Sequence, residues 1–173
     1  MFNQYCLAAL ASIALLSSGC MSNPSAKLPL ELQFQSVPAS ANTASIVGHQ
    51  QPRFTRVYAD RTAYIANING KRVMAGVEGW NQPLVLPAGT HELQLVYKMG
   101  GHHASTNINF DAEAGKAYQL NFITDIGTSV WSGNSYVDFW VEDQATQKPV
   151  SGVVRAEPPR VPATVYVPII MPK

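Results

Sequence analysis

Two histidines have the spacing that a metal site could use. His102 and His103 follow Gly100-Gly101, and adjacent imidazoles on a turn could bind a transition metal. Neighbouring residues of a strand point to opposite faces, and the sequence offers no evident third ligand. We therefore expect a solvated hairpin loop and no metal site.

Carboxylates near residue 140 are the other candidates for chemistry. Asp138 and Glu142 would share one face of a strand, and Asp143 follows them. Such a pair could act as general acid and base, but carboxylates at a strand end more often cap turns or pair with Lys and Arg. The serines at 129, 132 and 135 lie in no nucleophile elbow, and nucleotide-binding and calcium-binding motifs are absent from the sequence. We expect no catalytic residues and no cofactor, and an extracytoplasmic hydrolase is the weakest of the functions considered.

Aromatic residues are the candidates for binding. Trp131, Tyr136 and Trp140 lie in or beside the segment 125–142, within a loop rich in Gly, Ser and Asn, and Trp80 lies in a Gly-Trp-Asn turn. Exposed aromatic rings give a large contact area at a low entropic cost, which suits recognition of glycans or proteins. The alternative is that the N-terminal segment or the C-terminal tail covers these rings.

The N-terminus carries an apolar run from Leu7 to Leu16, followed by Ser17-Ser18-Gly19-Cys20. A bilayer core needs roughly twenty apolar residues, so a run of this length indicates a secretory signal and no membrane span. The small residues Ser17, Ser18 and Gly19 directly precede Cys20.

This ending resembles the lipobox of bacterial lipoproteins. The resemblance implies that the sulfur of Cys20 receives a diacylglyceryl group, that residues 1–19 are removed, and that the new amine is acylated. Met21 and Ser22 follow, and the absence of Asp there implies sorting to the outer membrane, on its periplasmic or surface face. The alternative is an ordinary secretory signal cut near Gly19, in which Cys20 has no role.

Cysteine and charge counts restrict the remaining functions. The two cysteines are Cys6, which would leave with the signal, and Cys20, which would carry lipid. The mature domain would then have no disulfide, no thiol catalyst and no Cys-ligated zinc. Twelve Lys plus Arg balance eleven Asp plus Glu without a basic patch, so we expect no nucleic-acid partner.

Alternating apolar and polar residues predict strands. The pattern is clearest over Thr90–Lys98, where His91, Leu93, Leu95 and Tyr97 form the apolar set. Similar runs are expected at residues 106–110, 118–122 and 137–141, and upstream at 55–59 and 63–69, the last ending in the hairpin signal Asn69-Gly70. No long helix is predicted. The spacing of turns favours a single all-β domain, an antiparallel β-sandwich of about seven or eight strands.

Three segments of turn chemistry carry a second resemblance. They are Ile68-Asn69-Gly70, then Leu84 to Leu93 with Pro87-Ala88-Gly89, then Ala112 to Tyr118 with Gly115-Lys116. The region from Tyr64 to Val150 resembles PEGA-like modules of bacterial envelope lipoproteins, with Pro-Ala-Gly-Thr in place of Pro-Glu-Gly-Ala. The resemblance implies a small β-sandwich outside the cytoplasm and transfers no catalytic residue.

The predicted organisation has four parts: a signal at 1–19, a lipidated Cys20 with a flexible tether to 44, a β-sandwich at 45–155, and a Pro-rich extended tail at 156–173. A short strand is conceivable at Leu30–Phe34. We expect a chain bound to the membrane through lipid on Cys20, whose domain is a protein-binding or scaffolding module for another envelope protein. The alternative is a glycan-binding or peptidoglycan-binding module that uses the exposed aromatic residues.

Overall fold

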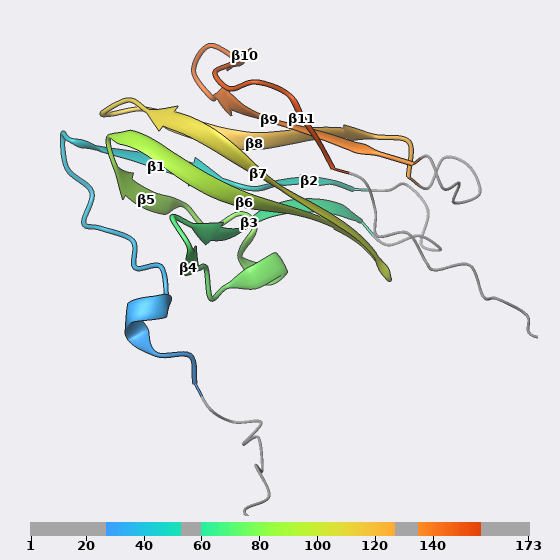
Figure 1. Cartoon of the computed structure of the whole chain (residues 1–173). Helices are drawn as coiled ribbons and strands as arrows, with labels where there is room; N and C mark the ends of the chain where they lie inside the picture. The colour runs from blue at the N-terminus through green and yellow to red at the C-terminus, as the bar shows by residue number, and fades with distance from the viewer. Residues whose placement is uncertain (1–26, 53–59, 127–134, 157–173) are drawn as a thin grey trace, which may run out of the picture.

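The computed structural model describes residues 27–52, 60–126 and 135–156. This part of the chain is all-β, as the sequence predicts, with eleven strands and two short 3-10 helices (Figure 1). Within it, no helix is long and apolar enough to cross a membrane. The elements are η1 (Leu30–Leu32), β1 (Thr43–Val47), β2 (His49–Gln51), β3 (Arg61–Ile68), β4 (Lys71–Arg72), η2 (Gly76–Gly79), β5 (Leu84–Pro87), β6 (Gly89–Met99), β7 (His102–Ala112), β8 (Ala117–Thr124), β9 (Val137–Asp143), β10 (Lys148–Pro149) and β11 (Val154–Ala156).

The strands form two sheets. The first has the order β10-β9-β8-β1-β5, with β11 also paired to β9, and the second has the order β2-β3-β6-β7, with β4 paired to β3. The ladders are antiparallel except that β1 runs parallel to β8, with Ile46 opposite Tyr118. The expected antiparallel arrangement therefore has one exception among the described strands.

A single glycine carries the chain from one sheet to the other. Gly48 separates β1, which pairs with β8, from β2, which pairs with β3. A Cβ atom at this position would lie 2.4 Å from the Ala63 carbonyl oxygen and 2.8 Å from that of Trp80. The backbones approach so closely that a side chain cannot fit at this corner.

The inward face of each strand is the one that the alternation predicts. In β6 the side chains of Leu93, Leu95 and Tyr97 are fully buried, and His91 is buried beside them. The residues of β8 and β9 that join them in one core cluster are Tyr118, Leu120, Phe122, Val137, Phe139 and Val141. Because both sheets contribute to this cluster, burial of apolar surface between them is the main stabilising contribution.

The hairpin expected at Asn69-Gly70 is confirmed. Both residues have positive φ, at 51° and 74°, and they connect Ile68 of β3 to Lys71 of β4. A two-residue turn with positive φ at both positions matches the right-handed twist of the strands, and Asn-Gly tolerates this conformation best.

Residues assigned by the sequence to the tether contact the domain. The Phe34 N–H donates to the Arg72 carbonyl at 2.8 Å, and the Val37 N–H donates to the Val85 carbonyl at 3.1 Å. Phe34 also packs against the core cluster. In place of a strand at Leu30–Phe34, the structure has η1 and a single bridge between Gln33 and Arg72. Prolines prevent a long helix here but leave extended backbone free to pair, which is why composition alone suggested a free linker.

Four predictions fall on residues outside the described ranges. They are the strand at 55–59, the signal with Cys20, the binding role of Trp131, and the Pro-rich tail after Ala156. Ala156 itself, the first residue assigned to the tail, is buried in β11 opposite Val137.

Candidate binding surface

The outward side of β9 holds two of the predicted binding residues. Val137, Phe139 and Val141 are buried, so Tyr136, Asp138, Trp140 and Glu142 lie on the opposite, half-buried side. This is the orientation that the alternation predicts. We call the outward side chains of β8, β9 and β11 the β9 face, which comprises Gln119, Asn121, Ile123, Tyr136, Asp138, Trp140, Glu142 and Arg155.

Strand register sets which side chains are neighbours on the β9 face. Asn121 lies opposite Trp140, and Ile123 lies opposite Asp138, across the β8–β9 ladder. Residues directly opposite each other in an antiparallel pair share a face and contact one another. Ile123 is 57% exposed, so the β9 face presents an aliphatic side chain beside its two aromatic rings.

Arg155 from β11 links Tyr136 to Asp138. Its guanidinium donates two hydrogen bonds of 2.7 Å to the two carboxylate oxygens of Asp138. The same guanidinium lies 4.1 Å from the centre of the Tyr136 ring, in the geometry of a cation–π contact. The hydrogen bonds from Arg155 lower the pKa of Asp138, and those to Asp138 raise the pKa of Arg155. The pair therefore stays charged at neutral pH and holds Arg155 over the ring.

Trp140 is bordered by polar groups. Its indole Nε1 donates to Oε2 of Glu142 at 3.4 Å, and Asn121 Nδ2 donates to the same oxygen at 3.0 Å. Beyond them, Gln119 Nε2 contacts His49 Nδ1 at 2.7 Å. Burial lowers the pKa of His49, while the negative charge of Glu142 acts in the opposite direction. The indole thus lies within a fixed row of amide and carboxylate groups.

The backbone of Tyr136 is anchored at the edge of the β9 face. Its N–H donates to Asp125 Oδ1 at 2.9 Å, and its carbonyl accepts from the Thr124 hydroxyl at 2.6 Å. Ile126 and Ser135, on the two sides of the segment 127–134, are both buried. Trp131, the remaining aromatic candidate of this region, lies outside the described residues.

Trp80 belongs to a different part of the molecule. It follows η2, which packs on β3 of the second sheet, and its carbonyl accepts a 2.6 Å hydrogen bond from the Gly48 N–H. Its side chain is half-buried. The structure therefore places Trp80 beside Gly48 and η2, and not among the side chains of the β9 face.

The carboxylates that could have served acid–base chemistry have structural partners. Asp138 pairs with Arg155, and Asp143 pairs with Lys116 at 2.9 Å. Asp143 Oδ1 also accepts from the N–H groups of Ala145 and Thr146, which caps the turn after β9, and these contacts together lower its pKa. This is the turn-capping and ion-pairing role expected from the sequence.

The histidines differ in their surroundings. His91 is buried, with Nε2 at 2.8 Å from the Pro87 carbonyl and Nδ1 at 3.0 Å from Asn69 Nδ2. Since a carbonyl only accepts, Nε2 carries the proton and Nδ1 accepts from the amide. His102 and His103 are exposed at the start of β7, opposite Met99 and Lys98. Among the described residues, no group of three metal-ligating side chains is found.

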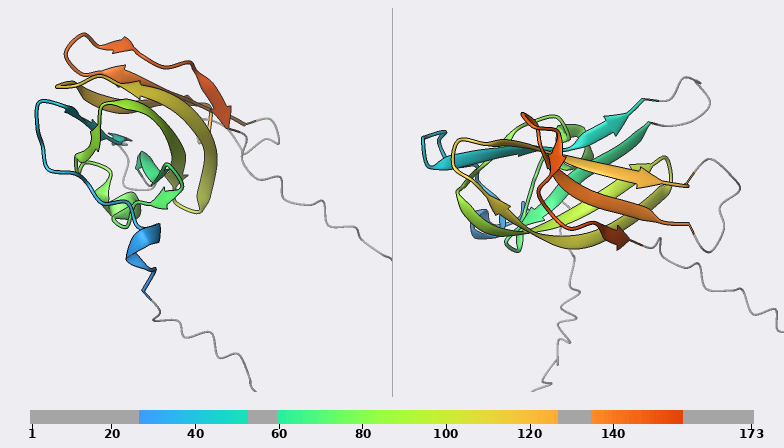
Figure 2. Two further views of the ribbon diagram at one scale, coloured as in Figure 1. Left: turned by 60° about the vertical axis from the view of Figure 1, so that its left-hand side comes forward. Right: turned by 90° about the horizontal axis from the view of Figure 1, so that it is seen from above.

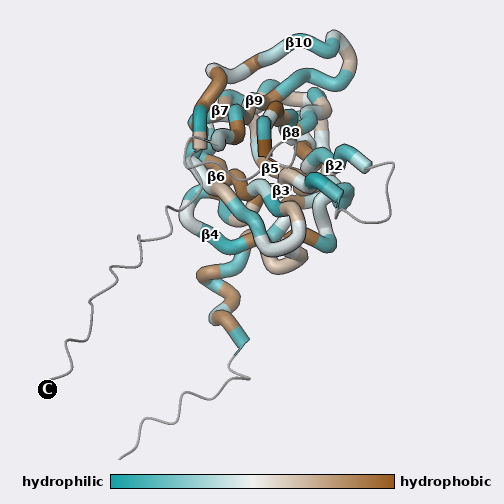
Figure 3. Tube along the Cα trace, turned by 90° about the vertical axis from the view of Figure 1, so that its right-hand side faces the viewer, coloured by the Kyte–Doolittle hydropathy of each residue, from teal (hydrophilic) through white to brown (hydrophobic). Residues whose placement is uncertain are grey.

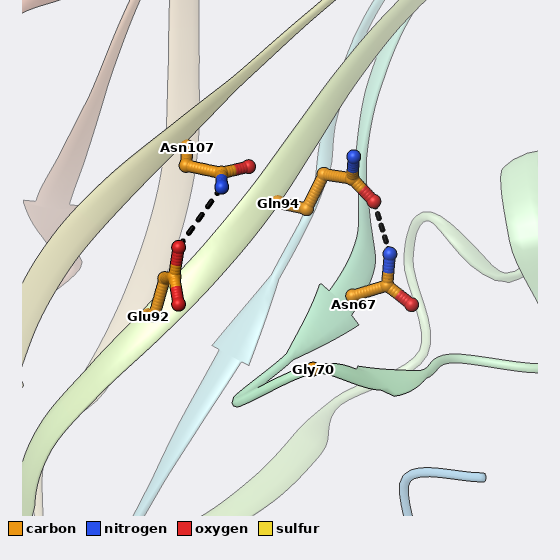
Figure 4. A pocket seen from close by; sticks show the side chains of 5 residues that line it. All are labelled: Asn67, Gly70, Glu92, Gln94 and Asn107. Carbon is orange, nitrogen blue, oxygen red and sulfur yellow. Dashed lines mark hydrogen bonds between the residues drawn. The ribbon is translucent and has the colours of Figure 1, made fainter. Parts of the chain in front are cut away.

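A small polar pocket lies on the outer side of the second sheet, and the sequence did not reveal it. It has a volume of about 150 Å³ and is lined by Asn67, Gly70, Glu92, Gln94 and Asn107 (Figure 4). Asn107 donates to Glu92 at 2.9 Å, and Asn67 donates to Gln94, so the lining groups largely satisfy one another. The sequence shows which residues of these strands are polar, but it does not show that β3 pairs with β6, and this pairing brings Asn67 next to Gln94.

Sequence reasoning missed four members of the β9 face, which are Gln119, Asn121, Ile123 and Arg155. Each lies far along the chain from its neighbour on β9, and only the strand register brings them together. Comparison with family models, curated proteins and solved structures finds no match for this chain.

Proposed function

We propose that the chain is a lipid-anchored lipoprotein of the bacterial cell envelope, whose domain binds another envelope protein through the β9 face. The two sheets would form one β-sandwich that serves as the rigid support. The observation that carries the proposal is the grouping of Tyr136, Trp140 and Arg155 beside the exposed Ile123. Tyr, Trp and Arg are the residues enriched at the energetic centres of protein interfaces.

The anchor rests on the residues before Cys20. An apolar run, small residues and a cysteine together favour lipidation of the thiol and outer-membrane sorting. Two or more acyl chains on one residue make membrane attachment stable, so the folded domain needs no membrane-spanning element.

The arrangement of the aromatic rings favours a protein over a glycan. A sugar stacks on an open ring face, whereas the Arg155 guanidinium already lies over one face of Tyr136. Fixed rotamers reduce the entropy lost on association, and the Arg155–Asp138 pair fixes both the cation and the ring. The β9 face is therefore pre-organised in the way that a protein partner exploits.

Glycan or peptidoglycan binding remains the second candidate because of Trp140. Its indole lies beside Asn121 and Glu142, and amide and carboxylate groups next to an aromatic ring can hydrogen-bond sugar hydroxyls. Tyr136 and Trp140 are four positions apart on one side of a strand, so both could contact one extended chain.

In-cell cross-linking of the full-length chain, followed by affinity purification, tests the proposal. We expect a specific envelope protein with the native chain, and its loss with Trp140→Ala or Tyr136→Ala. Asn109→Ala, an exposed residue on the other sheet, is the matched control and should retain the partner. Circular dichroism verifies that each variant folds.

The same variants separate the two candidates. If the native chain recovers no protein partner but co-sediments with isolated sacculi, and Trp140→Ala loses this co-sedimentation, the ligand of the β9 face is a glycan. Unchanged cross-linking in both aromatic variants would show that the β9 face is not the interface.

A further inference from the structure

The N-terminal end of the described chain presents aliphatic side chains to solvent. Leu30 is 72% exposed, Leu32 is 50% exposed, and Met74 is 54% exposed. We call these three side chains the N-terminal patch. Figure 1 shows η1, which carries the two leucines, projecting away from the sheets below β4, and Figure 3 shows the hydrophobic residues of this segment.

The N-terminal patch is held by the domain. Arg72 of β4 bridges to Gln33, and its carbonyl accepts from the Phe34 N–H at 2.8 Å. The Gln33 side chain in turn donates to the Leu28 carbonyl, which links the residues on the two sides of η1. The exposed leucines are thus fixed in place next to β4. Folding leaves them in water instead of burying them, and such positions mark interaction sites when they cluster.

Basic side chains lie beside the N-terminal patch. Lys27 and Arg72 are exposed next to Met74, and the exposed Lys71 precedes Arg72 in β4. The acidic residues of the neighbouring short helices are Glu31 in η1 and Glu78 in η2. A hollow of about 400 Å³ lies beside Met74, and Lys27, Leu28, Tyr64 and Arg72 are among the residues that line it. Burial raises the pKa of Tyr64 and the charge of Arg72 opposes the shift, so the phenol remains a neutral donor at physiological pH. Cations, a hydroxyl and apolar side chains around one hollow match the chemistry of an anionic lipid headgroup and its glycerol.

Chain length places this end of the domain near the membrane. Six residues, 21–26, separate Cys20 from Lys27. Fully extended chain spans at most about 3.6 Å per residue, so the Cα atom of Lys27 lies within about 25 Å of that of Cys20 in any conformation of the linker. If Cys20 carries lipid, the N-terminal patch cannot be far from the bilayer surface.

We propose that the N-terminal patch docks on an anionic lipid surface, with Leu30, Leu32 and Met74 entering the headgroup region and Lys27, Lys71 and Arg72 contacting phosphates. This inference rests on the lipid anchor of the proposed function. It also gives the domain an orientation. β9 and β10 lie on the opposite side of the molecule from η1 in Figures 1 and 2, so the β9 face would point away from the membrane.

Site-specific photo-cross-linking tests the orientation. The full chain is purified from membranes and reconstituted in vesicles of phosphatidylethanolamine and phosphatidylglycerol, with p-benzoylphenylalanine replacing Leu30. The matched control carries the same group in place of Val153, which is 64% exposed near β11. We expect lipid adducts at position 30 to exceed those at position 153 on the order of tenfold, because only inserted side chains contact acyl chains.

A second pair of variants tests the contribution of the leucines. Both variants carry p-benzoylphenylalanine in place of Met74. Leu30→Ser/Leu32→Ser should still float with vesicles through its lipid anchor, but it should form severalfold fewer lipid adducts at position 74. Val153→Ser, the control, should form as many lipid adducts at position 74 as the native chain. Replacing phosphatidylglycerol by phosphatidylcholine should lower adduct formation at position 30, since the three cations would lose their counter-charge.

The outcomes separate the docking from the anchor. If the native chain floats but position 30 forms no more lipid adducts than position 153, the docking is wrong and the anchor stands. If the native chain does not float, both are wrong. If position 30 cross-links to residues 157–173 or to another protein in place of lipid, the N-terminal patch has a protein occupant and the lipid docking is overturned.

Discussion

The β9 face and the N-terminal patch expose apolar groups in opposite ways. On the β9 face the rings are half-buried, and each polar neighbour has a partner at a defined distance, such as the 2.7 Å bonds between Arg155 and Asp138. In the N-terminal patch the aliphatic side chains are at least half exposed, and the nearby charges are all carried on flexible side chains. Side chains held in fixed positions suit a folded protein partner, whereas exposed aliphatic and basic side chains suit a fluid lipid surface.

The chain passes from the first sheet to the second at Gly48, and Gly48→Ala should have the largest effect. The added Cβ would lie 2.4 Å from the Ala63 carbonyl oxygen and 2.8 Å from that of Trp80, so the backbone at this corner must shift. We expect a loss of about 3 kcal/mol or more in the free energy of unfolding, measured by urea denaturation.

Gly101→Ala is the control for this substitution, because no atom lies within 4 Å of the position that its Cβ would occupy. It should change stability by less than about 1 kcal/mol. Equal effects of the two substitutions would show that the Gly48 corner is not tightly packed.

Trp140→Ala should follow in size, with its effect concentrated on binding. Loss of an interface aromatic typically costs about 2 kcal/mol, or roughly a 30-fold weaker dissociation constant. The partner recovered by cross-linking would be titrated against both chains by calorimetry. Phe139→Ala, at the adjacent buried position of β9, should instead lower stability by about 3 to 5 kcal/mol, which separates the two sides of the strand.

Acid should weaken the two ion pairs of β9, which join Arg155 to Asp138 and Lys116 to Asp143. Hydrogen bonds from Arg155 and Lys116 hold the pKa values of Asp138 and Asp143 below the ordinary value. A carboxyl group with a lowered pKa in the folded state stabilises the fold fully above its unfolded pKa of about 4, and this stabilisation is lost as the pH falls through the folded value. The free energy of unfolding should therefore decline between about pH 5 and pH 2.

Arg155→Gln combined with Lys116→Gln should flatten that decline, since both carboxyl groups would return toward their ordinary pKa values. Urea denaturation at several pH values measures the slope. An unchanged slope in the double variant would mean that other carboxyl groups set the acid stability.

Leu30→Ser/Leu32→Ser should have the smallest effect on folding. Both side chains are at least half exposed, so we expect a change within about 0.5 kcal/mol in the free energy of unfolding. A loss of more than about 2 kcal/mol would indicate that the leucines belong to the packed structure, and the contrast with the β9 face would then fail.

Local patterns predicted the strands well, because alternation and turn chemistry act over a few residues. The inward sets of β6, β8 and β9 and the hairpin at Asn69-Gly70 all follow from such patterns. They also predicted that Tyr136 and Trp140 share the outward side of β9.

Features that depend on pairing between distant segments were not predictable. The parallel contact of β1 with β8, the position of Arg155 over Tyr136, and the docking of Phe34 on β4 each require a register that no local signal specifies. The contacts of Phe34 and Val37 with the domain were not foreseen for the same reason, since a Pro-containing segment can still pair wherever its own N–H groups are free.

The position of β1 between β5 and β8 has a mechanical consequence. A pull on the N-terminus of the described chain would first detach the single contacts of Phe34 and Val37 and would then reach a strand bonded on both sides. Edge strands can be peeled one hydrogen bond at a time, whereas a central strand must break two ladders together. A domain tethered at this end would therefore unfold under force in two steps. A weak force would detach the segment around Phe34 and Val37 and lengthen the linker, and only a stronger force would pull β1 out of its sheet.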